Sequence, residues 1–174
     1  FAMLLGAMIM VVAYSGGAAA LANVFTKLAH SARSSQFASA CMGLAIFFDD
    51  YASALIVGST MRPITDSFKV SREKLAYLVD STTAPIAALF VSTWIGYEIG
   101  IIGDALAGTG FTMDAFSIFV VSIPARFYAI FAIIFVFMIV LSKRDFGPML
   151  AAEKRARTTK QLVAADTSDA AIEN

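Results

Sequence analysis

Charged residues are gathered in a few places in this chain, and long apolar stretches lie between them. Seventeen of the 26 charged residues lie in two segments, 62–74 and 143–174. The apolar stretches cover residues 1–14, 38–60, 75–102 and 127–142. A helix needs about 20 consecutive apolar residues to cross a bilayer. This alternation predicts an all-α integral membrane protein.

Composition supports the same class. Hydrophobic residues make up 59% of the 174 residues and charged residues 15%, whereas soluble domains carry about 25% charged residues. The net charge of zero gives no electrostatic attraction to a polyanion. One Cys and one His rule out a disulfide framework and a Cys/His zinc site. The composition therefore excludes a soluble globular domain, a disordered tail and a nucleic-acid-binding protein.

The polar segment 62–74 is predicted to be a turn, with Pro63 as helix breaker and Ser71 as N-cap of the next helix. Because Lys and Arg favour cytoplasmic loops, this turn and residues 143–174 are predicted to lie inside. The segment 103–114 has two acids and no basic residue, and is predicted to lie outside.

The N-terminal stretch, 1–14, has no initiator Met and no basic region before its apolar run, unlike a signal peptide. We interpret it as a helix cut partway, and the chain as a fragment. Apolar residues at helical spacing in 21–28 predict a short interfacial helix, with Lys27 and His30 on its solvated face.

The stretch 38–60 fits a re-entrant hairpin better than a single crossing. A single crossing would place His30 and Arg33 outside, against the charge bias. A hairpin keeps both ends inside, and its arms, 38–48 and 52–62, are each about 16 Å long as helices. Asp49 then lies near the middle of the bilayer.

The stretch 75–102 would be about 42 Å long as one helix, against a hydrocarbon core of about 30 Å. Pro85 lacks an N–H group and clashes with the carbonyl of Ser81. The sequence therefore predicts a break in this transmembrane helix at residues 80–85, with a freed backbone acceptor near several hydroxyl groups.

Three acids are predicted at membrane depth: Asp49, Asp50 and Asp80. Each charge costs about 2.5–3.5 kcal/mol at the centre of a membrane helix, and no Lys or Arg shares their segments. A carboxylate without a partner there binds either a proton or a metal cation. A site that alternates between the two exchanges protons for hard cations. The structural alternative is that Asp49 or Asp50 caps a helix, and that Asp80 satisfies a neighbouring helix end.

Several motifs resemble those of the NhaC-type Na+/H+ antiporter family, of the ion transporter superfamily. They are LAIFFDDYASALIVGSTMRPITD, SREKLAYLVDSTTAPIA, STWIGYEIG, RFYAI and KRDFGPMLAAEKRA. The resemblance covers most of residues 38–157. It implies an inverted-repeat transporter whose hairpin and broken helix build the ion site, of which this chain holds about one repeat. The remaining half must then come from elsewhere.

The resemblance also carries residues over. The family motif FDDYAN falls on 48–53, with Ser53 in place of Asn; VDSTAAP falls on 79–85, with Thr83 in place of Ala; and GNTMRP falls on 58–63, with Ser59 in place of Asn. The predicted cation and proton site comprises Asp49, Asp50, Ser53, Asp80, Ser81, Thr82 and Thr83, with Pro85 at the break, and Ser59, Thr60 and Glu98 as accessory positions. The expected Na+ ligands are Asp49, Asp50 and Asp80.

The predicted function is exchange of Na+ for H+ with no cofactor and no enzymatic activity. An exchanger of small carboxylates, such as malate or lactate, is the alternative, and an intramembrane aspartyl protease or a non-transporting fragment is more remote.

Residues 1–142 are expected to form the transport domain in a bacterial-type inner membrane, and a homodimer is left open. Residues 143–174 are expected to form a cytoplasmic tail, first basic and then disordered beyond Gln161, and Arg126 to extend toward the outer interface.

Overall fold

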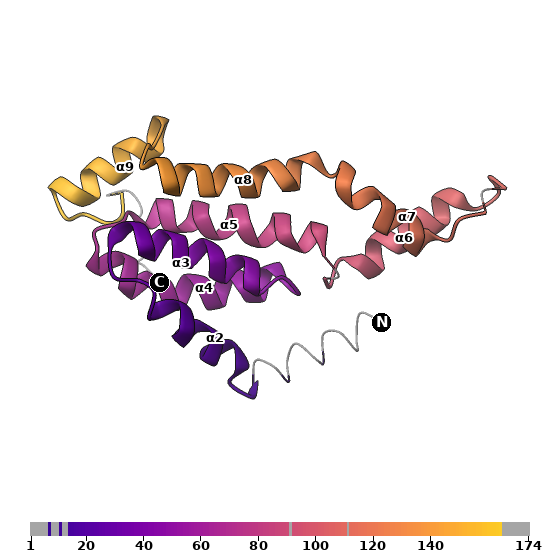
Figure 1. Ribbon diagram of the computed structural model, residues 1–174, viewed down its shortest axis with the longest axis horizontal. Helices are drawn as coiled ribbons and strands as arrows, with labels where there is room; N and C mark the ends of the chain where they lie inside the picture. Colours follow the sequence, from indigo (N-terminus) through magenta and orange to yellow (C-terminus); the bar gives the residue numbers. More distant parts are fainter. Residues whose placement is uncertain (1–6, 8–10, 12–13, 91, 111, 165–174) are drawn as a thin grey trace, which may run out of the picture.

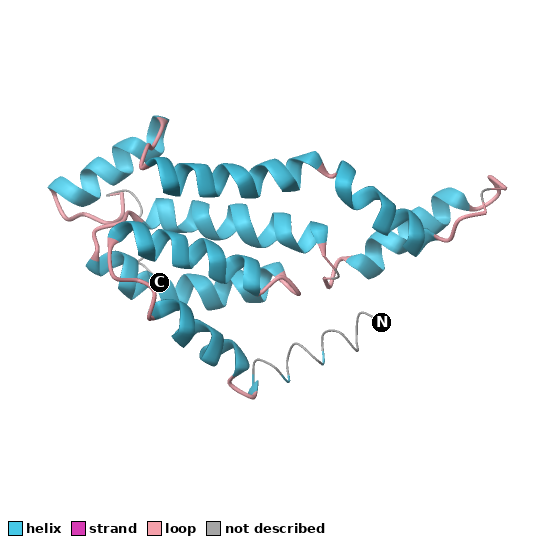
Figure 2. Ribbon diagram, in the orientation of Figure 1, coloured by secondary structure: helices cyan, strands magenta, loops and turns pink. Residues whose placement is uncertain are grey.

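The computed structural model describes residues 7, 11, 14–90, 92–110 and 112–164, and the described part contains helices and no strand (Figures 1 and 2). The helices are α2 (Gly17–Thr26), α3 (Ala32–Ala45), α4 (Asp50–Ser67), α5 (Arg72–Leu89), α6 (Ile95–Leu106), α7 (Ala115–Ser122), the 3₁₀ turn η1 (Ile123–Ala125), α8 (Phe127–Ser142) and α9 (Gly147–Thr158). The predicted all-helical class is therefore confirmed for these residues. Most of the first apolar stretch, 1–14, lies outside them.

Helices α3 and α4 run side by side in opposite directions, joined by a short tip (Figure 1). The Ser31 hydroxyl accepts a hydrogen bond from the Ser34 N–H and begins α3, and the Asp49 carboxylate accepts one from the Ala52 N–H and begins α4. The fold of this hairpin agrees with the prediction, although its helices are longer than the predicted arms. Its position in a membrane remains a prediction.

Two predicted helix breaks at prolines are wrong. Helix α4 continues through Pro63 to Ser67, so the polar turn is shorter than 62–74. Helix α5 continues through Pro85 to Leu89. A proline inside a helix costs about 3 kcal/mol, and burial of the neighbouring side chains offsets this cost. Met61 and Thr65 are buried beside Pro63, and Thr82, Thr83, Ile86 and Ala87 are buried around Pro85.

The chain leaves helical geometry after Leu89 instead. Phe90 adopts an extended conformation (φ −119°, ψ 175°), and α6 begins only at Ile95. We call residues 90–94 the α5–α6 linker. The predicted interruption of the long apolar stretch therefore exists, but it lies after Pro85 rather than at residues 80–85.

Helix α5 packs between the α3–α4 hairpin and α8 (Figure 1). The approach of α3 is close: a Cβ atom at Gly43 would lie 2.3 Å from Thr82 Oγ1. One turn before Thr82, Leu78 shares a buried apolar cluster with Ala40 of α3 and with Val136 and Val140 of α8. The hairpin and α8 therefore fix the position of α5 from both sides.

The predicted helix at residues 127–142 is confirmed with the same bounds, as α8. Among the described residues, one helical stretch, Phe127–Thr158, is long and apolar enough to cross a membrane, and Ala115–Ala125 is a shorter apolar helix. The helix predicted over 21–28 is present as α2, and Lys27 and His30 are exposed, as predicted.

Helices α6 and α7 lie side by side and extend away from the bundle (Figure 1). Between them, the predicted outer loop is shorter than 103–114, because α6 continues to Leu106. Asp114 caps α7, and hydrogen bonds from the Ser117 hydroxyl and N–H hold the pKa of this carboxyl below its ordinary value.

Helix α9 and the turn before it pack against the start of α5, and Arg155 of α9 forms an ion pair with Glu73 of α5. Lys74 Nζ lies 2.6 Å from Asp145 Oδ1, with both side chains almost fully buried. The N–H and hydroxyl of Ser71, the predicted N-cap of α5, both donate to the buried carboxylate of Glu153. The predicted basic tail is thus partly engaged with the bundle. Disorder is predicted for residues 162–174, of which 165–174 lie outside the described residues. Within the described part, the Leu162 carbonyl accepts a hydrogen bond from the Arg72 N–H at 3.1 Å.

Replacing Lys74 by Met should lower the free energy of unfolding by about 3–5 kcal/mol, because Asp145 would remain charged and buried without its partner. The double variant Lys74→Met/Asp145→Leu should recover most of this loss. Unfolding in mixed micelles, followed by circular dichroism, measures both. The exposed Lys154 of α9 gives the matched control, Lys154→Met, which should change stability by less than about 0.5 kcal/mol. If Lys74→Met and Lys154→Met lowered the free energy of unfolding equally, the buried ion pair would not be important for stability.

Candidate functional site

The hairpin tip and the α5–α6 linker meet, and the two adjacent aspartates lie at this meeting point. The Thr93 N–H donates to the Phe48 carbonyl (3.0 Å). The Thr93 hydroxyl donates to Asp49 Oδ2 (3.2 Å), and Trp94 Nε1 donates to Asp50 Oδ1 (3.0 Å). Each tip carboxylate therefore receives a hydrogen bond from a neutral donor of the linker.

Asp49 has a structural role as well. Its Oδ1 atom accepts from the Ala52 N–H at 2.7 Å, so the structural alternative of an N-cap holds for this residue. Asp50 is the acid in the first turn of α4, where the positive end of the helix dipole favours a negative charge. No Lys or Arg of the described residues forms an ion pair with either carboxylate. Helix dipole and neutral donors alone compensate their charge.

Ser53 lies one turn into α4, and its N–H donates to the Asp49 carbonyl (3.0 Å). Its side chain is fully buried, and its hydroxyl oxygen has no hydrogen-bond partner within the described part of the chain. A buried hydroxyl without a partner costs about 1–3 kcal/mol. The Ser53 hydroxyl is therefore an oxygen ligand without a competing hydrogen bond, about one helical turn from the two aspartates in sequence.

The hydroxyl groups predicted on α5 are differently placed. The Thr82 hydroxyl donates to the carbonyls of Leu78 and Val79 within its own helix, and Thr82 and Thr83 are both buried. Ser81 is half-buried. Of the accessory positions, Ser59 is exposed and its hydroxyl donates to the Leu55 carbonyl, and Thr60 is half-buried.

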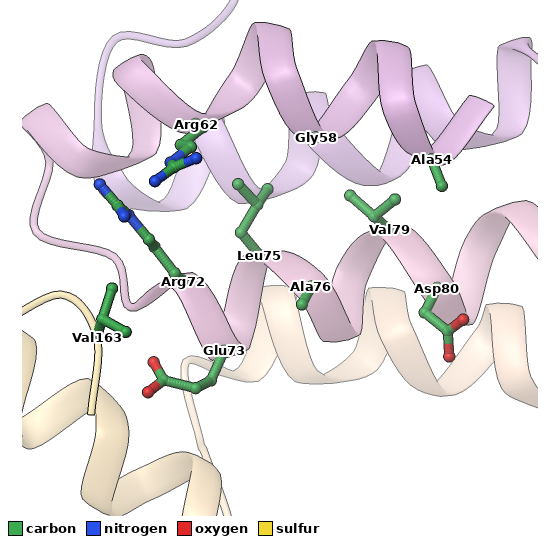
Figure 3. Close-up of a pocket in the computed structure, with 10 residues that line it drawn as sticks. All are labelled: Ala54, Gly58, Arg62, Arg72, Glu73, Leu75, Ala76, Val79, Asp80 and Val163. Carbon is green, nitrogen blue, oxygen red and sulfur yellow. The ribbon is translucent and has the colours of Figure 1, made fainter. Parts of the chain in front are cut away.

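Asp80 does not join the tip. Its side chain is exposed and lines a cavity of about 870 Å³ between α4 and α5. Figure 3 shows Asp80 and Ala54 at one end of this cavity, and Arg62 and Arg72 at the other. Since Ala54 follows Asp50 by four residues, about one helical turn separates this end from the tip. The described residues contain no group of three acidic, His or Cys side chains close enough to hold a metal ion.

Glu98 forms an ion pair with Arg126 in which both carboxylate oxygens accept hydrogen bonds from the guanidinium. Arg126 also donates to the Ala88 carbonyl (2.7 Å). Glu98, predicted as an accessory position of the cation site, is thus engaged in an ion pair with Arg126. Arg126 is engaged within the protein instead of extending alone toward an interface.

The sequence reasoning missed Thr93 and Trp94 as site residues. The prediction places the break at Pro85, near the middle of the apolar stretch 75–102. The signal that could have found them is the polar pair Ser92-Thr93, which interrupts the apolar run further along. Such residues stabilise non-helical backbone by local hydrogen bonds, and here the Ser92 hydroxyl accepts a hydrogen bond from the Trp94 N–H.

Asp49→Asn should leave stability nearly unchanged, because Asn caps a helix about as well as Asp, whereas Asp49→Ala should cost about 1 kcal/mol. Unfolding in mixed micelles measures the difference. Asp104→Ala, at an exposed position of α6, is the control and should behave like the unmodified chain. If Asp49→Ala were as stable as Asp49→Asn, the cap would not contribute.

Comparison with known proteins gives two matches. Residues 87–173 match the Na+/H+ antiporter family. An uncharacterized protein of Haemophilus influenzae is 39% identical over 158 residues, which cover 90% of this chain and 30% of that protein. The chain thus spans about a third of the length of this relative. No solved structure matches significantly.

Proposed function

Because the chain belongs to the Na+/H+ antiporter family, we propose that it is the ion-binding part of a secondary transporter that exchanges Na+ for H+ through the carboxylates of the hairpin tip. Membership implies a membrane protein and a transporter rather than an enzyme, with ions as its cargo. The observation that carries the proposal is the pair Asp49–Asp50, whose hydrogen-bond donors among the described residues are all neutral. One helical turn further along α4, the buried hydroxyl of Ser53 has no hydrogen-bond partner in the described part of the chain.

Exchange follows from the chemistry of these groups. A carboxylate removed from water favours its protonated form, and a bound cation favours the ionised form, so each ligand displaces the other. Adjacent aspartates titrate as a coupled pair, and we assign no separate proton to either. Asp80, one turn of helix away in the cavity, is the third carboxylate of the proposed site, with Ser81, Thr82 and Thr83 on the same helix.

We propose an NhaC-type transporter in which this chain supplies about one repeat and the rest of a longer protein supplies the other half. The matched residues cover 30% of the Haemophilus influenzae relative, which supports the presence of a further part of the transporter outside this chain. The transport domain is proposed to cover 1–142 and the cytoplasmic tail 143–174, in a bacterial inner membrane. The excess of basic residues in the tail supports its inside position.

A carboxylate exchanger is a second candidate. Such a transporter requires a positive group at its substrate site, and the cavity offers one. The cavity that contains Asp80 also contains Arg62, for which no ion pair exists among the described residues. Malate or lactate added to vesicles separates the two candidates: Na+-driven proton release that requires either anion would support the carboxylate exchanger.

Replacing Asp49, Asp50 or Asp80 by Asn in the full-length protein should abolish or strongly reduce Na+-driven proton release from proteoliposomes, measured with a pH dye. An amide cannot exchange the proton, while insertion and folding should persist. Ser53→Ala and Thr82→Ala should mainly raise the Na+ concentration needed for half-maximal release. Asp104→Asn is the matched control and should transport normally. Normal flux in all three aspartate variants would refute the proposed site.

If the hairpin is re-entrant, both of its ends lie on one side of the membrane. Cysteines placed at Ser34 and Ser67, in a Cys41→Ser background, should react with a membrane-impermeant reagent from the same side. A cysteine at Thr112, in the predicted outer loop, should react from the opposite side. Labelling of positions 34 and 67 from different sides would show that the segment crosses once.

A further inference from the structure

Arg126 contacts both sides of the interruption between α5 and α6. Its Nη1 atom donates to the Ala88 carbonyl at 2.7 Å, one residue before α5 ends. The same guanidinium donates to both carboxylate oxygens of Glu98, in the first turn of α6, with Nη2 to Oε2 at 2.5 Å. A single side chain from the start of α8 thus holds the end of one helix and the beginning of the next.

The chemistry of this contact suits arginine. The Ala88 carbonyl is one of the last four of α5, which have no partner within the helix, and a positive charge is favourable there. The planar guanidinium has donors enough to bind a carbonyl and both oxygens of a carboxylate at once. The Phe119 ring, 4.6 Å from Arg126 Cζ, covers its face. A lysine could supply the charge but not this geometry.

The two contacts bracket the linker that reaches the hairpin tip. Thr93 and Trp94 lie between Ala88 and Glu98 in sequence, and they donate to Asp49 and Asp50. The angle between the ends of α5 and α6 determines where these two donors lie. The Arg126–Glu98 pair is only partly exposed, at 20% and 31% for the two side chains, so solvent weakens it less than a surface pair.

We propose that Arg126 is a positioning residue of the ion site: together with Glu98 it fixes the α5–α6 linker and so holds Thr93 and Trp94 against the tip carboxylates. This inference rests on the proposed function of the tip. A purely structural ion pair would affect stability alone. In our proposal, loss of Arg126 should also change Na+ binding, because it displaces the linker. Trp94 offers a direct reporter, since it is the single tryptophan of the chain.

The test uses the full-length protein in proteoliposomes, with any tryptophan outside this chain replaced by Phe. Arg126→Gln should raise the Na+ concentration for half-maximal proton release about tenfold, the lower end of the loss seen when partners of ligand side chains are removed, with little change in maximal rate. Glu98→Gln should also raise the half-saturating Na+ concentration. Arg126→Lys should raise it nearly as much as Arg126→Gln does. Arg144→Gln, at the other end of α8, is the matched control and should leave half-saturation unchanged.

Two further measurements test the route through the linker. Arg126→Gln should shift Trp94 emission to longer wavelength and increase its quenching by acrylamide, because the indole loses its fixed position. Trp94→Phe should also raise the half-saturating Na+ concentration, and the double variant with Arg126→Gln should be no worse than the more affected single variant.

Unchanged half-saturation in Arg126→Gln would overturn the proposal, whatever the emission shows, and so would additive effects in the double variant. Absence of Na+-driven proton release from the unmodified protein would instead refute the proposed function. In that case Trp94 emission still decides whether Arg126 holds the linker: an unchanged spectrum in Arg126→Gln would refute this part too.

Discussion

Backbone groups at helix ends have no partner within the helix and must find one elsewhere when they are buried. This requirement shapes the centre of the described structure, where three helix ends meet. The Asp49 carboxylate caps the start of α4, and the Ala88 carbonyl near the end of α5 accepts from Arg126. In the turn between α3 and α4, the Phe48 carbonyl accepts from the Thr93 N–H. The same contacts that satisfy these ends also bring two carboxylates, a hydroxyl and an indole N–H together.

This arrangement explains why an ion site would lie at this place. A continuous helix uses its backbone groups internally and offers few polar atoms to a ligand. A helix start presents positive partial charge, which allows Asp49 and Asp50 to remain adjacent without a basic side chain. The close approach of α3 at Gly43 to Thr82, and the packing of α8 on the other side, hold α5 so that its linker reaches the tip.

Local sequence signals predicted the elements that local physics controls. The apolar run of α8, the Ser71 cap and the hairpin with aspartates at its tip all follow from patterns within about 20 residues. The positions of the helix breaks do not follow from local patterns. The free-energy cost of Pro63 and Pro85 inside a helix is offset by burial against helices that are distant in sequence. The contact between Thr93 and Phe48 joins residues 45 positions apart, so no local pattern could have indicated it. The polar pair Ser92-Thr93 marks a local break in the apolar run, but only the folded structure brings Thr93 and Trp94 to Asp49 and Asp50.

Ion pairing divides the acids of the described chain into two groups. Asp66, Glu73, Glu98, Asp145 and Glu153 each have a Lys or Arg partner. Asp104 and Asp114 are exposed near or in the α6–α7 loop, where water can solvate them. Within the described residues, Asp49, Asp50 and Asp80 alone combine an apolar stretch of sequence with the lack of a basic partner. A chain that pairs these five acids with Lys or Arg could have paired Asp49, Asp50 and Asp80 as well. Asp80 is exposed, whereas Asp49 and Asp50 are partly buried. For these two, a bound cation or proton would offset the cost of removing a carboxylate from water.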